Sequence, residues 1–251
     1  MPSDSTVRTA VVLAGGLGTR LRSAVPDLPK PMAPVAGRPF LEHLLDRWIA
    51  QGIDRFVLSV AYRHEIIQAH FGGRYRTARI DYVVEPAPLG TGGALLLAMS
   101  ALDPEVPFLL LNGDTYFAVD LTRLDAFARA HDAEWCISLF RANEAGRYMG
   151  MQVESDGRIV ALKSNTDDVG RLANGGVYRI LPRAVRALPF AAGQKVSLED
   201  DMFTAAVAAS ARVFGLECPA PFINIGVPSD YHRAHEILRH APLPRLPGNL
   251  P

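Results

Sequence analysis

The sequence predicts a three-layer α/β protein in which helices cover both faces of a mostly parallel central sheet. Short apolar runs alternate with segments whose apolar residues recur at helical spacing, which is the pattern of such folds. At 251 residues, the chain is long enough for one large domain with a substantial core. Glycines or acidic residues directly follow several of the apolar runs, where open α/β sheets bind ligands.

The composition excludes several classes of function. The formal net charge is zero and charged residues make up 21% of the chain, so nothing predicts a nucleic acid or an anionic membrane as partner. The apolar runs are far shorter than a membrane span, and residues 1–8 lack the apolar core of a signal peptide. Cys136 and Cys218 lie in strand-like runs without metal-ligand spacing, so we expect buried free thiols and a cytoplasmic protein.

The most informative stretch begins with the first predicted strand, residues 10–14. This run is short, apolar and β-branched, as expected of a strand buried on both faces. Three glycines follow within residues 15–18, and their backbone N–H groups, unobstructed by a Cβ, predict a cradle for phosphate oxygens. Arg20 and the proline-flanked Lys30 add positive charge. We therefore predict a polyphosphate site at the carboxyl end of the first strand.

Spacing excludes two familiar glycine-rich loops. A dinucleotide fingerprint requires a third glycine where Leu21 stands, which argues against an NAD-binding protein. A P-loop requires Gly-Lys-Ser/Thr, and no such tripeptide follows. An ordinary glycine turn is the alternative, but a turn does not require three glycines, an arginine and a lysine between prolines.

The other elements follow from periodicity and turn signals. Apolar residues at helical spacing between Pro39 and Gly52 predict a helix. A hairpin is predicted where residues 149–153 and 158–162 flank Ser155-Asp156-Gly157. Further strands are expected at 56–60, 80–84, 108–111 and 135–140, and further helices at 64–71, 95–102, 121–130 and up to about residue 239.

A second glycine-rich segment, residues 85–94, connects a predicted strand to a predicted helix. Gly90, Gly92 and Gly93 would let a ligand approach the backbone closely, and free N–H groups at a helix start favour an anion or a polar base edge. A plain strand–helix connection is the alternative, although one glycine would suffice for it.

Asp114 follows the buried run 108–111, with Asn112 and Gly113 between them. Asn-Gly-Asp is good turn chemistry, but an acidic residue at this edge of the sheet also fits a hard cation, because Mg²⁺ prefers carboxylate oxygen and accompanies triphosphates. Further along, Lys195 and the acidic residues 199–201 open a helix. On physics alone, matching of the helix dipole and a functional role remain equally open for this acidic turn.

The motifs LAGGLGTRL (residues 13–21) and PKPM (residues 29–32), with PLGTGGA (residues 88–94), resemble the signature of the sugar-1-phosphate nucleotidyltransferases. The resemblance covers nearly the whole chain. It implies a Rossmann-like (GT-A-like) nucleotidyltransferase fold with a small sugar-binding lobe. It also implies a reaction in which a nucleoside triphosphate and a sugar 1-phosphate give a nucleotide sugar and pyrophosphate. Mg²⁺ would be the cofactor. The protein could form a homo-oligomer.

The resemblance also implies a set of site residues and a division of the chain. A single domain at 1–240 would comprise a nucleotide-binding part at about 8–118 and a sugar-binding part at about 119–240, followed by a proline-rich tail at 241–251. Arg20, Lys30 and Asp114 would be catalytic, and Asp114 and Asn224 would bind the metal. The nucleotide-binding residues would be Leu13, Ala14, Gly15, Gly16, Gly18, Thr19, Glu85, Gly90, Thr91, Gly92 and Asn112. The sugar-binding residues would be Gly113, Lys163, Asn174, Gly175, Lys195 and Glu199.

Two positions depart from the family pattern. Asn224 stands where relatives usually carry a second metal-binding aspartate, and an amide oxygen ligates Mg²⁺ more weakly. After the hairpin, relatives commonly carry Phe-x-Glu-Lys, whereas this chain has Leu162-Lys163-Ser164-Asn165. Either Lys163 replaces the usual lysine that contacts the sugar phosphate, or this role is lost.

Within the family, residues 22–34 with GRPFL and SLE-x-D most resemble the D-glycero-α-D-manno-heptose 1-phosphate guanylyltransferases, which make GDP-heptose for surface polysaccharides. No residue reads guanine by a physical argument at this point. One alternative is a uridylyl- or thymidylyltransferase for N-acetylmuramate or hexose 1-phosphate. Another is a catalytically silent regulatory subunit that binds nucleotide sugar, which only Asn224 favours.

Overall fold

The computed structural model describes residues 6–16, 18, 20–21, 25–142, 148, 150–163 and 170–239. Thr19, the tail at 241–251 and the side chain of Lys163 lie outside the described part. The chain divides into two compact units. Of the described residues, 8–88, 111–118 and 221–239 belong to the N-terminal unit, and 6–7, 89–110 and 119–220 belong to the central unit. Residues 89–110 thus group with the second half, whereas the predicted sugar-binding part begins only at about 119.

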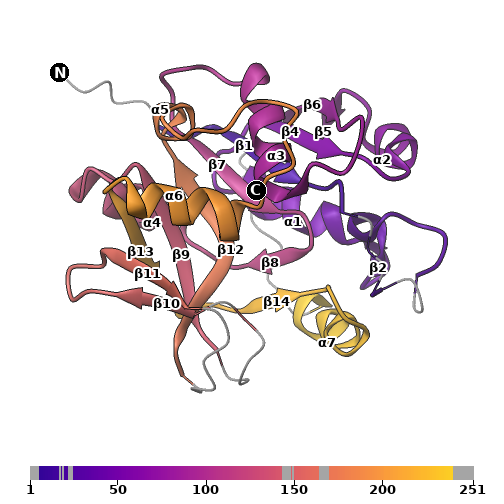
Figure 1. Ribbon diagram of the computed structural model, residues 1–251. Helices are drawn as coiled ribbons and strands as arrows, with labels where there is room; N and C mark the ends of the chain where they lie inside the picture. Colours follow the sequence, from indigo (N-terminus) through magenta and orange to yellow (C-terminus); the bar gives the residue numbers. More distant parts are fainter. Residues whose placement is uncertain are drawn as a thin grey trace. The chain divides into compact units, whose positions relative to one another are not determined.

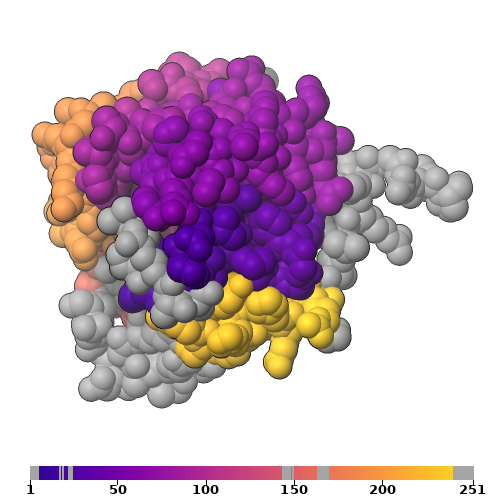
Figure 2. Space-filling model, turned by 90° about the vertical axis from the view of Figure 1, so that its right-hand side faces the viewer, coloured from indigo at the N-terminus to yellow at the C-terminus, as the bar shows by residue number. Residues whose placement is uncertain are grey.

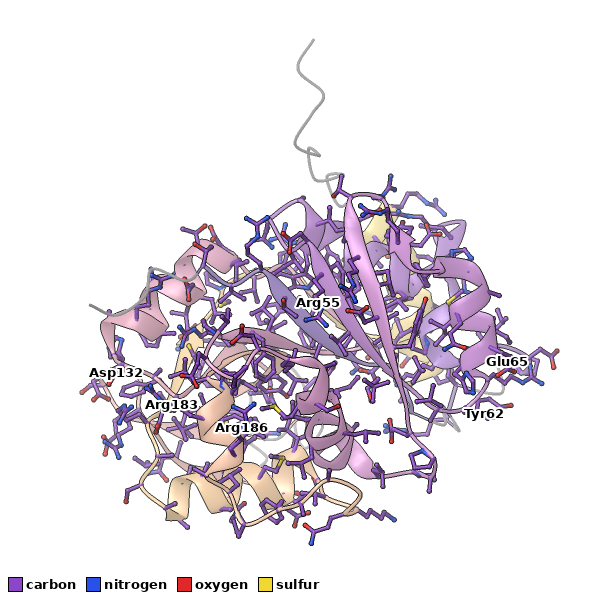
Figure 3. All side chains as sticks on the ribbon, turned by 90° about the horizontal axis from the view of Figure 1, so that it is seen from above. Arg55, Tyr62, Glu65, Asp132, Arg183 and Arg186 are labelled. Carbon is purple, nitrogen blue, oxygen red and sulfur yellow. The ribbon has the colours of Figure 1, made fainter. Side chains whose placement is uncertain are left out.

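The N-terminal unit is built on parallel strands. β1 pairs with β4 in parallel, β4 pairs with β6 in parallel, and β5 adds an antiparallel edge (Figure 1). On the sheet, Arg55 of β4 donates to Asp81 of β6 at 2.7 Å (Arg55 is labelled in Figure 3). The elements are β1 (Thr9–Leu13), α1 (Phe40–Ile49), β4 (Arg55–Val60), α2 (His64–Phe71), β5 (Arg74–Tyr75) and β6 (Ala78–Val84).

A smaller group of elements in the same unit carries the C-terminal helix. β8 and β14 pair antiparallel, and β2 and β3 form a short hairpin. α7 packs through Tyr231, Ala234 and Leu238 on an apolar cluster that includes Val35 and Phe40, and Figure 2 shows this helix in yellow against the indigo N-terminal residues. These elements are η1 (Lys30–Met32), β2 (Pro34–Val35), β3 (Arg38–Pro39), β8 (Thr115–Phe117), β14 (Phe222–Asn224) and α7 (Pro228–Arg239).

The central unit holds a mixed group of strands. β9 pairs antiparallel with β12 and parallel with β13, while β10 pairs antiparallel with β11 and β12. α4 packs against β9, β12 and β13, and α6 packs against β11 (Figure 1). The strands are β9 (Trp135–Arg141), β10 (Gly150–Val153), β11 (Ile159–Lys163), β12 (Leu172–Ile180) and β13 (Val213–Glu217). The helices are α3 (Gly90–Ala98), η2 (Met99–Ala101), α4 (Leu121–Ala130), α5 (Pro182–Arg186), η3 (Leu198–Met202) and α6 (Phe203–Ala208). β7 (Phe108–Asn112) spans the boundary between the units.

Most predicted elements are confirmed, including the hairpin at Ser155-Asp156-Gly157, where Gly157 has a φ of +91°. The helix after the second glycine-rich segment begins at Gly90 and not at residue 95, so the glycines form its first turn. The helix expected after Lys195 starts with a π-helical turn, η3, which is capped by Ser197. π-Helical turns frequently lie at functional sites.

Cys136 and Cys218 are buried free thiols, as predicted. Burial raises the pKa of Cys136 to about 12 and that of Cys218 to about 11, so both stay protonated at neutral pH. Among the described residues, no helix is both long enough and apolar enough to cross a membrane.

Candidate active site

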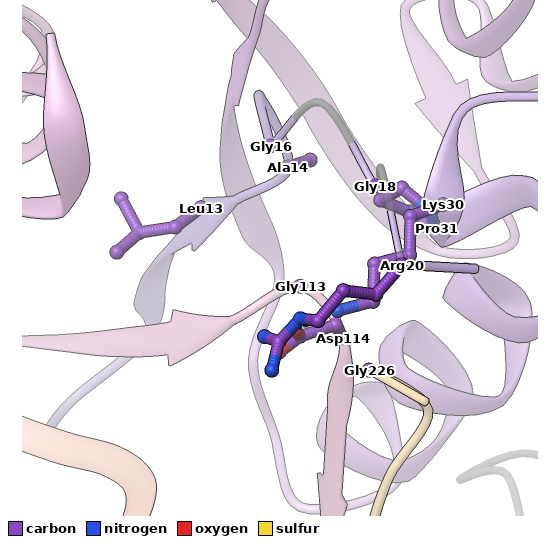
Figure 4. A pocket seen from close by; sticks show the side chains of 10 residues that line it. All are labelled: Leu13, Ala14, Gly16, Gly18, Arg20, Lys30, Pro31, Gly113, Asp114 and Gly226. Atoms are coloured by element: carbon purple, nitrogen blue, oxygen red, sulfur yellow. Dashed lines mark hydrogen bonds and ion pairs between the residues drawn. The ribbon is translucent and has the colours of Figure 1, made fainter. Parts of the chain in front are cut away.

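A pocket of about 220 Å³ lies in the N-terminal unit at the carboxyl end of β1 (Figure 4). Eight of its residues are among the predicted site residues, and the Arg20 side chain reaches into it. Pro31 and Gly226 also line it and were not predicted. The lining residues are Leu13, Ala14, Gly16, Gly18, Arg20, Lys30, Pro31, Gly113, Asp114 and Gly226.

Lys30 and Asp114 form an ion pair within this pocket. Only 11% of the Lys30 side chain and 29% of the Asp114 side chain is exposed. A buried ammonium requires a counter-charge, and Asp114 supplies it through Oδ2. Lys30 begins the short helix η1, and Asp114 lies in the turn between β7 and β8, so the pair joins two segments far apart in sequence.

The other oxygen of Asp114 accepts two neutral donors. Asn224 Nδ2 donates to Asp114 Oδ1 at 3.2 Å, and the Thr115 hydroxyl donates to the same oxygen at 3.1 Å. The Asn224 amide oxygen accepts from the backbone N–H of Gly226 at 2.6 Å, which fixes the orientation of the amide. Asn224 therefore turns a donor toward Asp114. The Gly226 N–H takes one of the two lone pairs of the amide oxygen, and the prediction that Asn224 binds a metal stays a prediction.

The residues present fit a divalent cation that arrives with substrate phosphates. No group of three or more His, Cys, Asp or Glu side chains suited to a metal ion occurs among the described residues. Among the described lining residues, Asp114 alone places a carboxylate in the pocket, and Mg²⁺ is commonly held by one or two carboxylates together with substrate phosphates. This single carboxylate therefore suits a cation that is bound mainly by substrate phosphates and not one that is held by protein ligands alone.

Two of the glycines stand where another part of the chain comes too close for a Cβ, a carbonyl in one case and a carboxylate in the other. A Cβ on Gly113 would lie 2.5 Å from the carbonyl oxygen of Leu13, which accepts from the Gly113 N–H at 3.0 Å. A Cβ on Gly15 would lie 2.3 Å from the carboxylate of Glu85, which Ser59 contacts at 3.4 Å. Gly16, by contrast, has open space at its Cβ position and faces the pocket. In the first loop, Gly16 and Gly18 thus line the pocket, whereas Gly15 makes room for Glu85.

Residues 89–94 of the second glycine-rich segment lie in the central unit and pack on residues 194–198. The N–H groups of Gly92 and Gly93 both donate to the carbonyl of Val196, at 2.9 and 3.1 Å. The expectation that these N–H groups are free for a ligand is therefore wrong, because the chain's own backbone takes them. Thr91 and Glu199, predicted on opposite sides of the substrate, are joined by a hydrogen bond of 2.8 Å.

The structure also describes the surroundings of other predicted site residues. Asn174 and Gly175 are in β12, where the Asn174 amide donates to the Tyr178 hydroxyl at 2.8 Å and accepts from the Gly176 N–H at 3.0 Å. Lys195 is exposed. Asn112 ends β7, and its side-chain oxygen is buried without a hydrogen-bond partner among the described residues.

Comparison with known proteins decides the family. Residues 9–236 match the model of a family described as nucleotidyl transferase. The chain belongs to this family.

Similar proteins include two curated D-glycero-α-D-manno-heptose 1-phosphate guanylyltransferases. That of Aneurinibacillus thermoaerophilus is 38% identical over 92% of this chain and 98% of the relative. That of Campylobacter jejuni is 34% identical over 89% of this chain and 96% of the relative. The crystal structure of HddC from Yersinia pseudotuberculosis is 30% identical, covers 92% of this chain and 99% of that protein, and has a TM-score of 0.81. HddC has also been crystallised in complex with GMP-PN.

These comparisons confirm the predicted fold class. The chain has the α/β fold of the sugar nucleotidyltransferases, with a mostly parallel central sheet and flanking helices. Gly16, Gly18 and Lys30, which belong to the signature that the sequence analysis singled out, line the pocket described above.

Gly113 provides a test of close packing at the pocket. We expect Gly113→Ala to lower the free energy of unfolding by about 1–3 kcal/mol, because the new methyl meets main-chain atoms that cannot rotate away. Gly16→Ala is the matched control and should change it by less than about 0.5 kcal/mol. Urea unfolding followed by circular dichroism measures both, and equal losses would contradict the packing argument.

Asn224 provides a test of how the charge next to Asp114 affects stability. Asn224→Asp sets a second carboxylate beside Asp114, and we expect it to destabilise the protein in EDTA by about 1 kcal/mol or more through like-charge repulsion. Mg²⁺ should restore the melting temperature of this variant and leave the wild type unchanged. Asn224→Ala, which loses the hydrogen bond without adding charge, should not respond to Mg²⁺. A wild-type melting temperature that rises as much as that of Asn224→Asp would refute this account.

Proposed function

We propose that the protein transfers GMP from GTP to D-glycero-α-D-manno-heptose 1-phosphate, which gives GDP-heptose for surface polysaccharide synthesis and releases pyrophosphate. The observation that carries this proposal is the pocket that places Arg20, Lys30 and Asp114 together, in a chain similar over most of its length to two such guanylyltransferases. The buried reduced thiols support a cytoplasmic location, where nucleoside triphosphates are made and used.

The reaction is an in-line displacement at the α-phosphorus of GTP by a phosphate oxygen of the sugar phosphate. That oxygen is already a nucleophile at neutral pH, so the protein needs no general base. Its task is to bring two polyanions together and to stabilise the charge on the transferring group. In our proposal, Arg20 binds the departing pyrophosphate, and the loop at Gly16 and Gly18 receives phosphate oxygens.

Lys30 is the proposed stabiliser of the transferring α-phosphate. Its ammonium is already desolvated and held in place by Asp114, so a phosphate oxygen can replace the carboxylate as its partner without reorganising the loop. The composition supports a special role, because Lys30, Lys163 and Lys195 are the only lysines in a chain that otherwise uses arginine. All three were predicted site residues. A compact ammonium fits the confined position beside Gly226, whose Cβ position lies 3.2 Å from Lys30 Nζ.

Mg²⁺ is the proposed cation, and Asp114 is the residue that would hold it. When bound, it would neutralise triphosphate charge and orient the phosphates. Asn224 would keep Asp114 oriented for this cation, through the hydrogen bond from the Asn224 amide nitrogen to the Asp114 carboxylate.

Glu85 is the proposed reader of guanine. Guanine presents two adjacent donors, its ring N1–H and its 2-amino group, and a carboxylate accepts from both. Glu85 stands at the end of β6, and its carboxylate rests against Gly15. On the sugar side, we propose Asn174, Gly175 and Glu199 as contacts to the heptose, with Lys195 or Lys163 near its phosphate.

Pyrophosphate release with Mg²⁺ tests the function directly. GTP, UTP, dTTP, CTP and ATP are each combined with heptose, mannose, glucose and N-acetylmuramate 1-phosphates. The proposal is supported if GTP and the heptose phosphate are the only pair that gives a strong signal. A strong signal from another pair would show that the proposed substrates are wrong. Binding of nucleotide by calorimetry without any turnover would instead support a regulatory subunit.

We expect turnover to require Lys30, and we expect that an arginine at this position cannot replace it. We expect Lys30→Ala to reduce kcat by about a hundredfold or more, as the loss of one electrostatic stabiliser commonly does. Lys30→Arg keeps the charge but should recover little of this loss, because the bulkier guanidinium does not fit beside Gly226. Arg8→Lys, at an exposed ion pair with Asp54, is the matched control and should keep full activity. A fully active Lys30→Arg variant would contradict the argument that a guanidinium is too bulky for this position.

Glu85→Gln should change the choice of base. A glutamine amide presents one acceptor and one donor, so it no longer matches the two donors of guanine. We expect kcat/KM for GTP to fall about tenfold or more relative to that for UTP, since losing a hydrogen bond to a charged group costs about 1.5–3 kcal/mol. An unchanged ratio of the two kcat/KM values would place base recognition elsewhere.

A further inference from the structure

Thr91, the second residue of α3, is hydrogen-bonded on both sides of its hydroxyl. The oxygen accepts from the backbone N–H of Leu198 at 2.9 Å, and the O–H donates to Glu199 Oε2 at 2.8 Å. Because the amide can only donate and the carboxylate only accepts, the direction of both bonds is fixed. The hydroxyl therefore holds the Glu199 carboxylate in one orientation.

The backbone around Thr91 is built for this contact. Val196 accepts from the N–H groups of Gly92 and Gly93 and donates to the carbonyl of Leu89 at 2.8 Å. The approach is so close that a Cβ on Gly90 would lie 2.6 Å from Val196 O, and one on Gly93 would lie 2.4 Å from Gln194 O. Three main-chain hydrogen bonds thus dock residues 194–198 on the start of α3 and bring Glu199 to Thr91.

Glu199 differs from the two acidic residues that follow it. Ser197 caps η3 by accepting from the Asp200 N–H at 3.0 Å, and the Asp201 carboxylate accepts from the Ser197 N–H at 2.8 Å. Asp200 and Asp201 therefore act within the helix start, as an acidic first turn commonly does. Glu199 is directed to Thr91 instead, so matching of the helix dipole does not explain its position.

We propose that Thr91 is a positioning residue for sugar recognition: its hydroxyl orients the Glu199 carboxylate, which accepts hydrogen bonds from hydroxyl groups of the sugar phosphate. This inference rests on the proposed function and moves Thr91 from the nucleotide side to the sugar side. The residues proposed for the triphosphate belong to the N-terminal unit, whereas Thr91 and Glu199 both belong to the central unit. Loss of the hydroxyl should therefore affect the sugar phosphate and not GTP.

The test compares Thr91→Val, which keeps the shape but removes the hydroxyl, with Thr91→Ser, which keeps the hydroxyl. In the full chain, we expect Thr91→Val to raise KM for heptose 1-phosphate about tenfold, with KM for GTP within about twofold of wild type. Thr91→Ser should restore the KM for the sugar phosphate. Thr91→Ala serves as the second hydroxyl-free variant if Thr91→Val does not fold, as judged by its melting temperature.

A double-mutant cycle with Glu199→Gln separates positioning from general packing. If Thr91 acts through Glu199, adding Thr91→Val to Glu199→Gln should raise KM for the sugar phosphate little further. Additive effects, an equal rise in KM for GTP, or an unchanged KM in Thr91→Val would each overturn the inference while the wild type still turns over. A wild type that releases no pyrophosphate from any substrate pair would instead remove the proposed function, and this inference with it.

Discussion

The contact between Lys30 and Asp114 is the interaction on which the pocket depends. It brings η1 against the turn that follows β7, and Asn224 extends it to β14, so three segments from distant parts of the sequence converge on one carboxylate. The ammonium is almost fully buried and would be costly without this partner. A charged site that is satisfied before substrate arrives keeps its geometry, which is the condition for electrostatic stabilisation of a transition state.

Glycine has two different tasks in this chain, and only one of them concerns a ligand. Gly16 faces open space in the pocket, where a phosphate oxygen can approach the backbone. Gly113 makes room for the carbonyl of Leu13, and Gly93 makes room for that of Gln194, so these glycines admit the protein's own main chain. Counting glycines in a loop therefore overstates how much of it is open to substrate.

The sequence predicted the order of strands and helices and the residues at the end of β1, because both follow from local periodicity and from glycine and lysine spacing. It did not predict that Pro31 and Gly226 line the pocket, because a proline and a glycine carry no polar side-chain group that would mark them as site residues. The orientation of the Asn224 amide was not predictable either, because it depends on which groups surround the amide in the folded chain: Asp114 on its nitrogen and the Gly226 N–H on its oxygen. The contact between Thr91 and Glu199 likewise requires two segments to pack together, and neither segment's sequence indicates that the other one is its neighbour.

Asn224 has a consequence for the charge of the pocket as a whole. Among the described residues that line it, Arg20 and Lys30 contribute two positive charges and Asp114 one negative charge, which leaves a net positive field for a polyanion. An aspartate at position 224 would cancel that field in the absence of a cation, because a second carboxylate would then stand beside Asp114. The asparagine keeps the hydrogen bond that orients Asp114 while adding no charge. The pocket of this chain is therefore attractive to a triphosphate through its own side chains, before any cation contributes.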